Sequence, residues 1–128
     1  KDLIALFGLT PFLKQKLGNL SGGTKQKVNI ILTFMFNSNL IILDEPTTGL
    51  DPISLIYLKE IIRKEKEKGK TLLITTHIMS LVEEIADEIV FLLDGKIYFQ
   101  GSVAKLKTQT HQTNLEHAIA NLMTKENV

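Results

Sequence analysis

Two adjacent carboxylates, Asp44 and Glu45, come directly after an apolar run and are the residues of this chain best suited to chemistry. The run at positions 40–43 reads Leu-Ile-Ile-Leu, which predicts a strand buried on both faces of a parallel sheet. Ligands bind at the carboxyl ends of such strands, so the two acids are candidates for metal binding and proton transfer. Pro46 would end the strand, and an acidic turn without a chemical role is the alternative interpretation.

A second candidate is the turn Ser21-Gly22-Gly23, which precedes apolar residues at helical spacing and predicts a helix over 22–36. Ser21 would be its N-cap. The first N–H groups of a helix lack partners and the helix dipole is positive there, so this turn could bind an anion. The glycines would let a phosphate approach the backbone closely. An ordinary capped turn is the other interpretation, and the motifs further along the chain decide between the two.

His77 comes after a second apolar strand, predicted over 71–75, and so would lie at the same type of strand end as the acids. A parallel pairing of the two strands would bring His77 beside Asp44 and Glu45, where an imidazole could contact a terminal phosphate or an attacking water. A lone histidine is more often exposed or caps a helix. Between the strands, Asp51 and Pro52 predict the N-cap and first residue of a further helix.

The tripeptide Gly69-Lys70-Thr71 looks like the end of a phosphate-binding P-loop but lacks the rest of the motif. A P-loop needs a glycine five residues before Gly69, and that position is Lys64. The tripeptide also leads into a strand rather than a helix, so it is predicted to be a helix-to-strand turn. No other G-x-x-x-x-G-K-[ST] pattern occurs in the sequence.

Composition narrows the classes of protein. At 128 residues the chain is long enough for one domain or part of one. Fifteen basic residues against 14 acidic ones give a net charge of +1, which argues against a dedicated nucleic-acid-binding protein. No cysteine is present, so neither a disulfide framework nor a thiolate metal site is expected. Polar residues interrupt the longest apolar stretch, and we expect neither a signal peptide nor a transmembrane helix.

The other predicted elements come from periodicity and turn residues. A helix end is expected over 1–9, and a short helix with Thr10 as N-cap over 10–16. After His77 we expect a helix over 79–86, a strand over 88–93, an Asp94-Gly95 hairpin turn into a strand over 96–100, and a short helix within 101–107. Residues 108–113 are polar and expected to be mobile. A weak helix over 115–122 and a frayed end complete the chain.

Taken in order, the segments LSGGTKQKV, LIILDEPTTGLD and LLITTH resemble the C-terminal part of an ATP-binding cassette (ABC) ATPase domain, over about residues 9–101. The resemblance implies an α/β fold, part of the P-loop NTPase fold, with a parallel sheet, a helical segment that carries the signature motif and a C-terminal hairpin. It divides the chain into part of a helical subdomain (1–39), the C-terminal part of the ATPase core (40–101) and a helical tail (102–128).

The resemblance also implies roles for the residues at the strand ends. Asp44 would hold Mg2+ through water, which suits a hard cation that bridges phosphates. Glu45 would be the general base that polarises the attacking water. His77 would be the switch histidine that holds the γ-phosphate and the water in line.

The signature residues Ser21, Gly22, Gly23 and Thr24, together with Asp51 of the D-loop, would contact ATP bound to a second subunit. The fifth signature residue of the family is usually Gln, and Thr24 has a shorter side chain. Since the P-loop is missing, these residues alone are not expected to bind ATP usefully. The chain is therefore interpreted as a fragment whose parent is an ATPase.

The partners implied by the resemblance are a second ATPase domain, in a homodimer or heterodimer, and a transmembrane permease subunit. The helices and loops look like those of exporter-type cassettes, which lie in the cytoplasm at the inner face of the membrane and are held there by the permease. ATP would join the two domains and its hydrolysis would release them. A partial sheet would also leave an unpaired apolar edge, so dimerisation or domain swapping of the isolated chain is expected.

Two other interpretations remain open from the sequence. Coiled-coil ATPases of DNA repair and chromosome maintenance also place a signature and a Walker B strand together, far in sequence from the P-loop. Their lobe should be entered from a long heptad helix, and the segment 1–9 is too short to show one. The second alternative is a non-catalytic interaction module that keeps only the fold, although the presence of both Glu45 and His77 argues against it.

Overall fold

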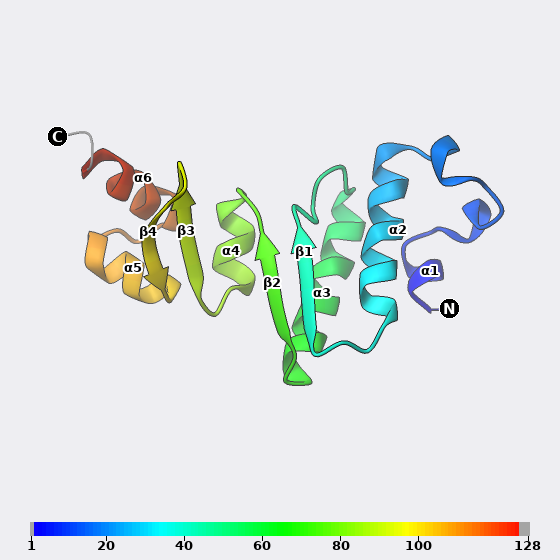
Figure 1. Cartoon of the computed structure of the whole chain (residues 1–128), viewed down its shortest axis with the longest axis horizontal. Helices are drawn as coiled ribbons and strands as arrows, with labels where there is room; N and C mark the ends of the chain where they lie inside the picture. The colour runs from blue at the N-terminus through cyan, green and yellow to red at the C-terminus, as the bar shows by residue number, and fades with distance from the viewer. Residues whose placement is uncertain (1, 126–128) are drawn as a thin grey trace. The chain divides into compact units, whose positions relative to one another are not determined.

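The computed structural model describes residues 2–125, and the chain separates into two compact units, residues 1–76 and 77–128 (Figure 1). We call them the first and second unit and describe each by itself. The predicted α/β class is confirmed, with one parallel and one antiparallel pair of strands among the described residues.

The first unit contains a parallel two-stranded sheet with its helices. Its elements are α1 (Asp2–Leu6), the 3-10 helices η1 (Thr10–Phe12) and η2 (Leu17–Asn19), α2 (Gly22–Met35), β1 (Leu40–Asp44), α3 (Pro52–Glu67) and β2 (Thr71–Thr75). β1 pairs with β2 in parallel, with Leu40 opposite Thr71 and Asp44 opposite Thr75. Because the two strands run parallel, their carboxyl ends lie at the same edge of the sheet, and α3 is the crossover connection that this pairing requires.

Only one face of this sheet is buried, so the predicted burial of β1 on both faces is wrong. Ile41 and Leu43 are buried, whereas Leu40 and Ile42 are 55% and 58% exposed. Alternate side chains of a strand point to opposite faces, and α2 and α3 supply cover for one of them. A continuous apolar run predicts full burial wrongly here, because the run itself does not tell how many faces are covered.

The second unit is an antiparallel hairpin with three helices. Its elements are α4 (Met79–Ile85), β3 (Ile89–Leu93), β4 (Lys96–Gly101), α5 (Val103–Thr110) and α6 (Leu115–Lys125). The predicted turn is confirmed, since Asp94 and Gly95 both adopt positive φ angles of 49° and 74° and join β3 to β4. The core of this unit consists of Phe99, Leu106, Leu115 and Ala118.

One further local prediction is wrong, and another is wrong for part of its range. The sequence predicts Thr10 as an N-cap, but Leu9 occupies that position and Thr10 begins a 3-10 helix of three residues. The sequence predicts a mobile segment over 108–113, but α5 continues to Thr110, whose side chain is buried and donates to the carbonyl of Leu106 at 2.8 Å. The predicted frayed end falls on residues 126–128, outside the described residues.

No helix within residues 2–125 combines the length and apolar character needed to cross a bilayer.

Candidate functional site

Asp44 is the last residue of β1, and its carboxylate is exposed at the carboxyl end of the sheet. Its Oδ1 atom accepts a hydrogen bond from the Oγ1 hydroxyl of Thr75. Thr75 is the last residue of β2 and the register partner of Asp44, so the parallel pairing itself brings the two side chains together. This contact orients the carboxylate while the rest of it remains accessible to solvent or to a hydrated cation.

Glu45 turns the chain sharply out of the strand. Its φ angle is 45°, in the left-handed region that non-glycine residues rarely adopt, and its N–H donates to the carbonyl of Thr75 at 2.9 Å. Such backbone costs about 1–3 kcal/mol and persists where the surroundings fix it, often at functional sites. The carbonyl of Glu45 accepts from Gln26 Nε2 at 3.2 Å and from Thr48 N–H at 3.3 Å, so neighbouring elements hold the turn.

The predicted helix cap at Ser21 is confirmed. Ser21 precedes α2 with extended backbone, and its Oγ atom accepts from the Thr24 N–H at 3.2 Å. The hydroxyl of Thr24 lies 2.8 Å from the same Oγ atom, and Ser21 is exposed. The first turn of this 14-residue helix has no acidic side chain. Its positive dipole end is therefore not neutralised, which favours an anion at this turn.

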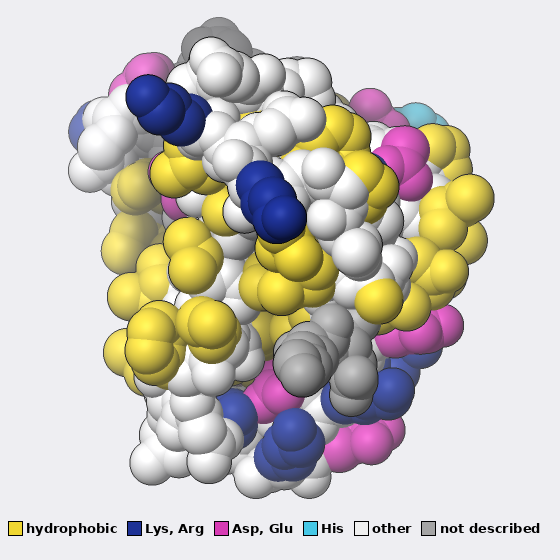
Figure 2. All heavy atoms as spheres, turned by 90° about the vertical axis from the view of Figure 1, so that its right-hand side faces the viewer, with side chains coloured by type: hydrophobic (Ala, Val, Ile, Leu, Met, Phe, Trp, Pro, Cys, Tyr) yellow, Lys and Arg dark blue, Asp and Glu magenta, His cyan; other side chains and the backbone are white. Residues whose placement is uncertain are grey.

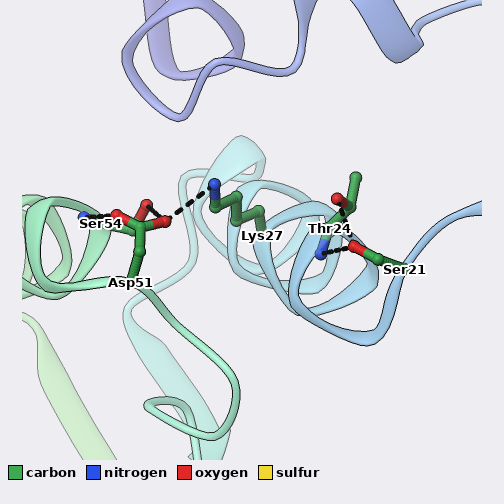
Figure 3. Close-up of polar contacts among 5 residues, drawn as sticks. All are labelled: Ser21, Thr24, Lys27, Asp51 and Ser54. Atoms are coloured by element: carbon green, nitrogen blue, oxygen red, sulfur yellow. Dashed lines mark hydrogen bonds and ion pairs between the residues drawn. The ribbon is translucent and has the colours of Figure 1, made fainter.

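Asp51 caps α3, as predicted, and is also tied to α2. Its Oδ1 atom accepts from the Ser54 N–H at 2.9 Å, its Oδ2 atom accepts from Ser54 Oγ at 2.8 Å, and Lys27 Nζ lies 3.0 Å from Oδ2. Figure 3 shows Lys27 extending from α2 to Asp51, while Ser21 and Thr24 lie at the start of that helix. The backbone hydrogen bond from Ser54 and then the Lys27 ammonium hold the pKa of Asp51 well below its usual value.

The start of α2 also touches the loop after β1 through its backbone. A Cβ atom built on Gly23 would lie 2.7 Å from the carbonyl oxygen of Gly49, closer than real side chains come. Gly49 itself has a φ angle of 73°, which favours glycine. The predicted residues from Ser21 to Thr24, the acidic pair and Asp51 therefore belong to one folded unit.

His77 lies at the start of the second unit and is exposed. Its approach to the acids of the first unit stays a prediction. Among the described residues, no group of three or more His, Cys, Asp or Glu side chains could hold a metal ion. Asp44 alone nevertheless fits Mg2+, because this ion keeps several of its waters and commonly takes only one or two protein carboxylates together with phosphates.

The space beside Asp44 within the first unit is small. A cavity of about 90 Å3 between α2 and β1 is lined by Gln26, Ile42, Leu43, Asp44 and others. Pockets that enclose small ligands measure about 300–1,000 Å3. The space beside Asp44 therefore offers polar contacts at the surface without enclosing a small ligand.

Sequence reasoning misses three residues of this site: Gln26, Lys27 and Thr75. A signal exists for each. Gln26 and Lys27 lie three and four residues after Gly23, so a helix carries them on the face that meets the loop. Thr75 ends the second strand at the position equivalent to Asp44, which the parallel pairing could have indicated.

Comparison with known proteins finds a matching family model and several related ATP-binding proteins. A family model described as "AAA domain, putative AbiEii toxin, Type IV TA system" matches residues 13–83. The ABC transporter ATP-binding protein NatA of Bacillus subtilis (strain 168) is 31% identical over 117 residues, which are 91% of this chain and 48% of that protein. The lantibiotic transport ATP-binding protein SrtF of Streptococcus pyogenes is 42% identical over 98 residues, 77% of this chain and 43% of that protein.

A solved structure described as the ATP-binding subunit of an ABC transporter superposes with a TM-score of 0.90 at 31% sequence identity. The match covers 95% of this chain and 52% of the solved chain. The chain thus spans about half of the solved chain and less than half of each of the two curated relatives.

Proposed function

The chain belongs to the AAA-domain ATPases and, among them, to the ATP-binding proteins of ABC transporters, and on this premise we propose that it supplies the C-terminal part of an ATP-hydrolysing transporter subunit. That subunit powers transport through a separate membrane subunit. The observation that carries the proposal is the pairing, in one folded unit, of an exposed capped helix N-terminus with a carboxylate pair at a strand end. A helix N-terminus can bind the phosphates of a nucleotide, and a carboxylate can accept the proton of the water that hydrolyses the phosphoanhydride bond between them.

In the proposed reaction Glu45 is the general base. It accepts a proton from the water that attacks the γ-phosphorus, while the bond between the β- and γ-phosphates breaks and ADP leaves. Its fixed backbone keeps the carboxyl group at the strand end. Asp44 would hold Mg2+ through water, and the ion would offset the charge of the phosphates when bound. His77 orients the γ-phosphate and the water.

The signature residues Ser21, Gly22, Gly23 and Thr24 bind the phosphates of a nucleotide held mainly by a second ATPase domain, with Asp51 at the same interface. The exposed Ser21 and the positive end of α2 support this part of the proposal. The hydroxyl of Thr24 already contacts Ser21 at 2.8 Å. A Gln side chain, usual in the family, would reach further, so we expect a weaker contact to the partner's nucleotide here.

The P-loop that binds the chain's own nucleotide comes from polypeptide outside these 128 residues. The absence of the motif from the sequence and the share of relatives that the chain spans support this division. The permease places the assembly at the cytoplasmic face of the membrane. The relative named for lantibiotic transport is compatible with an exporter-type subunit.

The catalytic part of this proposal is tested in the complete gene product that contains the chain. We expect Glu45→Gln to lower the ATP turnover by about 10²–10⁴-fold, the usual contribution of a general base, while the fold is kept. Glu67→Gln, which neutralises an exposed carboxylate at the end of α3, is the matched control and should leave turnover unchanged. Unchanged turnover in Glu45→Gln would refute the assignment.

The proposal that the P-loop lies outside these 128 residues is tested on the 128-residue chain itself. Isothermal titration with ATP and Mg2+ should detect no binding at micromolar nucleotide, because the residues present contact phosphate from one side only. Circular dichroism of the same sample should show the helix and strand content of the structure. A folded chain that binds ATP with micromolar affinity contradicts the proposal.

A further inference from the structure

Three contacts join the helix that carries the signature residues to the loop between β1 and α3. Gly23 packs against the backbone of Gly49, Gln26 Nε2 donates to the carbonyl of Glu45 at 3.2 Å, and Lys27 Nζ lies 3.0 Å from Asp51 Oδ2. The three contacting residues of α2 are spaced at i, i+3 and i+4, so they share one face of the helix. This face contacts the loop along its length, from Glu45, the proposed general base, to Asp51, the cap of α3.

We infer that Lys27 is a positioning residue, which holds the loop 45–51 in a fixed relation to α2 by pairing with Asp51. The inference rests on the proposed function and deepens it, because it links the turn that contacts a partner's nucleotide to the loop that carries the proposed base. Lys27 itself is 21% exposed and points to Asp51 rather than to Ser21 (Figure 3).

The geometry at Asp51 makes this pair a fixed link. Each carboxylate oxygen accepts from Ser54 at the start of α3, so the carboxylate is already oriented when Lys27 reaches it. The same contacts keep Asp51 ionised, which maintains the attraction. Lys27 therefore connects α2 to a loop whose far end is anchored on α3.

If Lys27 served only to stabilise the fold, its variants would be expected to lose stability. Asp51 is 46% exposed in its side chain, and ion pairs of this kind contribute little to global stability. A Lys27 variant should therefore fold normally, and any loss of function reports the position of the loop. A Lys27 that instead bound phosphate directly would change the KM for ATP.

The test uses the complete gene product with the variants Lys27→Met, Lys27→Arg, Asp51→Asn and the double variant Lys27→Met with Asp51→Asn. We expect Lys27→Met to lower kcat about tenfold with KM unchanged, since small misplacements of reacting groups can cost on the order of 10²-fold in rate. Lys27→Arg keeps the ion pair and should restore most of kcat. The double variant should be no slower than the slower single variant, because both remove the same link.

Hydrogen exchange of the same proteins supplies a readout that does not need activity. Lys27→Met should raise the exchange rates of the amides in 47–51 about threefold or more, because a loop that loses a tether opens more often. Lys25→Met removes a positive charge from an exposed position of the same helix and is the control for both measurements.

The outcomes separate this inference from the proposed function. Normal exchange in Lys27→Met, additive losses in the double variant, or a raised KM with unchanged kcat would each overturn the positioning role. If Glu45→Gln abolishes turnover while Lys27→Met behaves like Lys25→Met, the proposed function stands and the inference fails. If Glu45→Gln leaves turnover unchanged, the proposed function fails. The proposed role of Lys27 in positioning the general base then fails as well.

Discussion

Gly23 shows how a single residue can decide the geometry of the site. A methyl group at this position would meet the carbonyl oxygen of Gly49 at 2.7 Å, and the obstacle is backbone rather than a movable side chain. We therefore expect Gly23→Ala to push the loop away from α2 and to lower the free energy of unfolding by about 1–3 kcal/mol, as overpacking does. Urea unfolding of the complete gene product measures this loss.

Gly22 offers the matched control for that measurement, because a Cβ atom there would have no neighbour within 4 Å. Gly22→Ala should leave the stability unchanged or raise it by about 0.4–1 kcal/mol through the smaller entropy of the unfolded chain. Equal stabilities for the two alanine variants would show that the loop is free to move, contrary to the close contact between the backbones of Gly23 and Gly49.

Residues of the candidate site differ in how far the sequence predicts them. The caps at Ser21 and Asp51 are predicted correctly because each depends on the residues immediately after it. The pair of Lys27 with Asp51 escapes prediction because it depends on how α2 packs on a distant loop. The left-handed backbone of Glu45 escapes it too, since local propensity disfavours this conformation and tertiary contacts impose it.

At the scale of elements, a charged pair joins the end of α3 to the start of β2. Glu65 accepts from Lys70 and from Lys68, and the side chains of Glu65 and Lys70 are only 12% and 9% exposed. The hydrogen bond from Lys70 lowers the pKa of Glu65. The pair therefore ties the last turn of α3 to the residue that precedes β2.

Glu65→Gln should lower the free energy of unfolding at neutral pH by about 1.5–3 kcal/mol, the range for a hydrogen bond to a charged group. Because the folded-state pKa lies below the ordinary value of 4.5, the wild-type advantage is present above that value. It should be lost as the pH falls through the lower, folded-state pKa. Urea unfolding of the complete gene product across this pH range measures both effects.

The matched control for this pH dependence is Glu67→Gln, an exposed change two residues further along the same helix. It should shift stability by less than about 0.5 kcal/mol at any pH, as surface substitutions usually do. If Glu65→Gln lowers the free energy of unfolding by the same amount in acid as at neutral pH, packing and not the charge of the carboxylate is responsible.

Elements are predicted well where their signals are local. The bounds of α2, the start of α3 and the Asp94-Gly95 hairpin agree with the sequence patterns, since caps and turn residues define them. The predicted burial of Leu40 and Ile42 is wrong, and so is the predicted mobility of Thr110, because both depend on which other elements pack against the segment. The parallel pairing is predictable from two apolar strands separated by a helix.

At the scale of the whole molecule, the first unit exposes many apolar side chains. Figure 2 shows them on the face that carries α1 and α2. The exposed apolar residues of α1, η1, η2, α2 and their flanks are Leu6, Phe12, Leu13, Leu17, Leu32, Met35 and Phe36. The sheet adds Leu40, Ile42 and Leu73, and within the described residues β1 and β2 pair only with each other. Both an apolar surface and open strand edges favour association.

The 128-residue chain should therefore self-associate, with an average mass by light scattering that rises with concentration. Ile42→Lys places a charge on the open face of the sheet and should reduce this association, since inward-pointing or exposed charges on strands oppose pairing. Thr113→Lys, at an exposed polar position of the second unit, adds the same charge and should not. A monomer at high concentration, or equal effects of the two lysines, would show that the open face and edges of the sheet do not drive association.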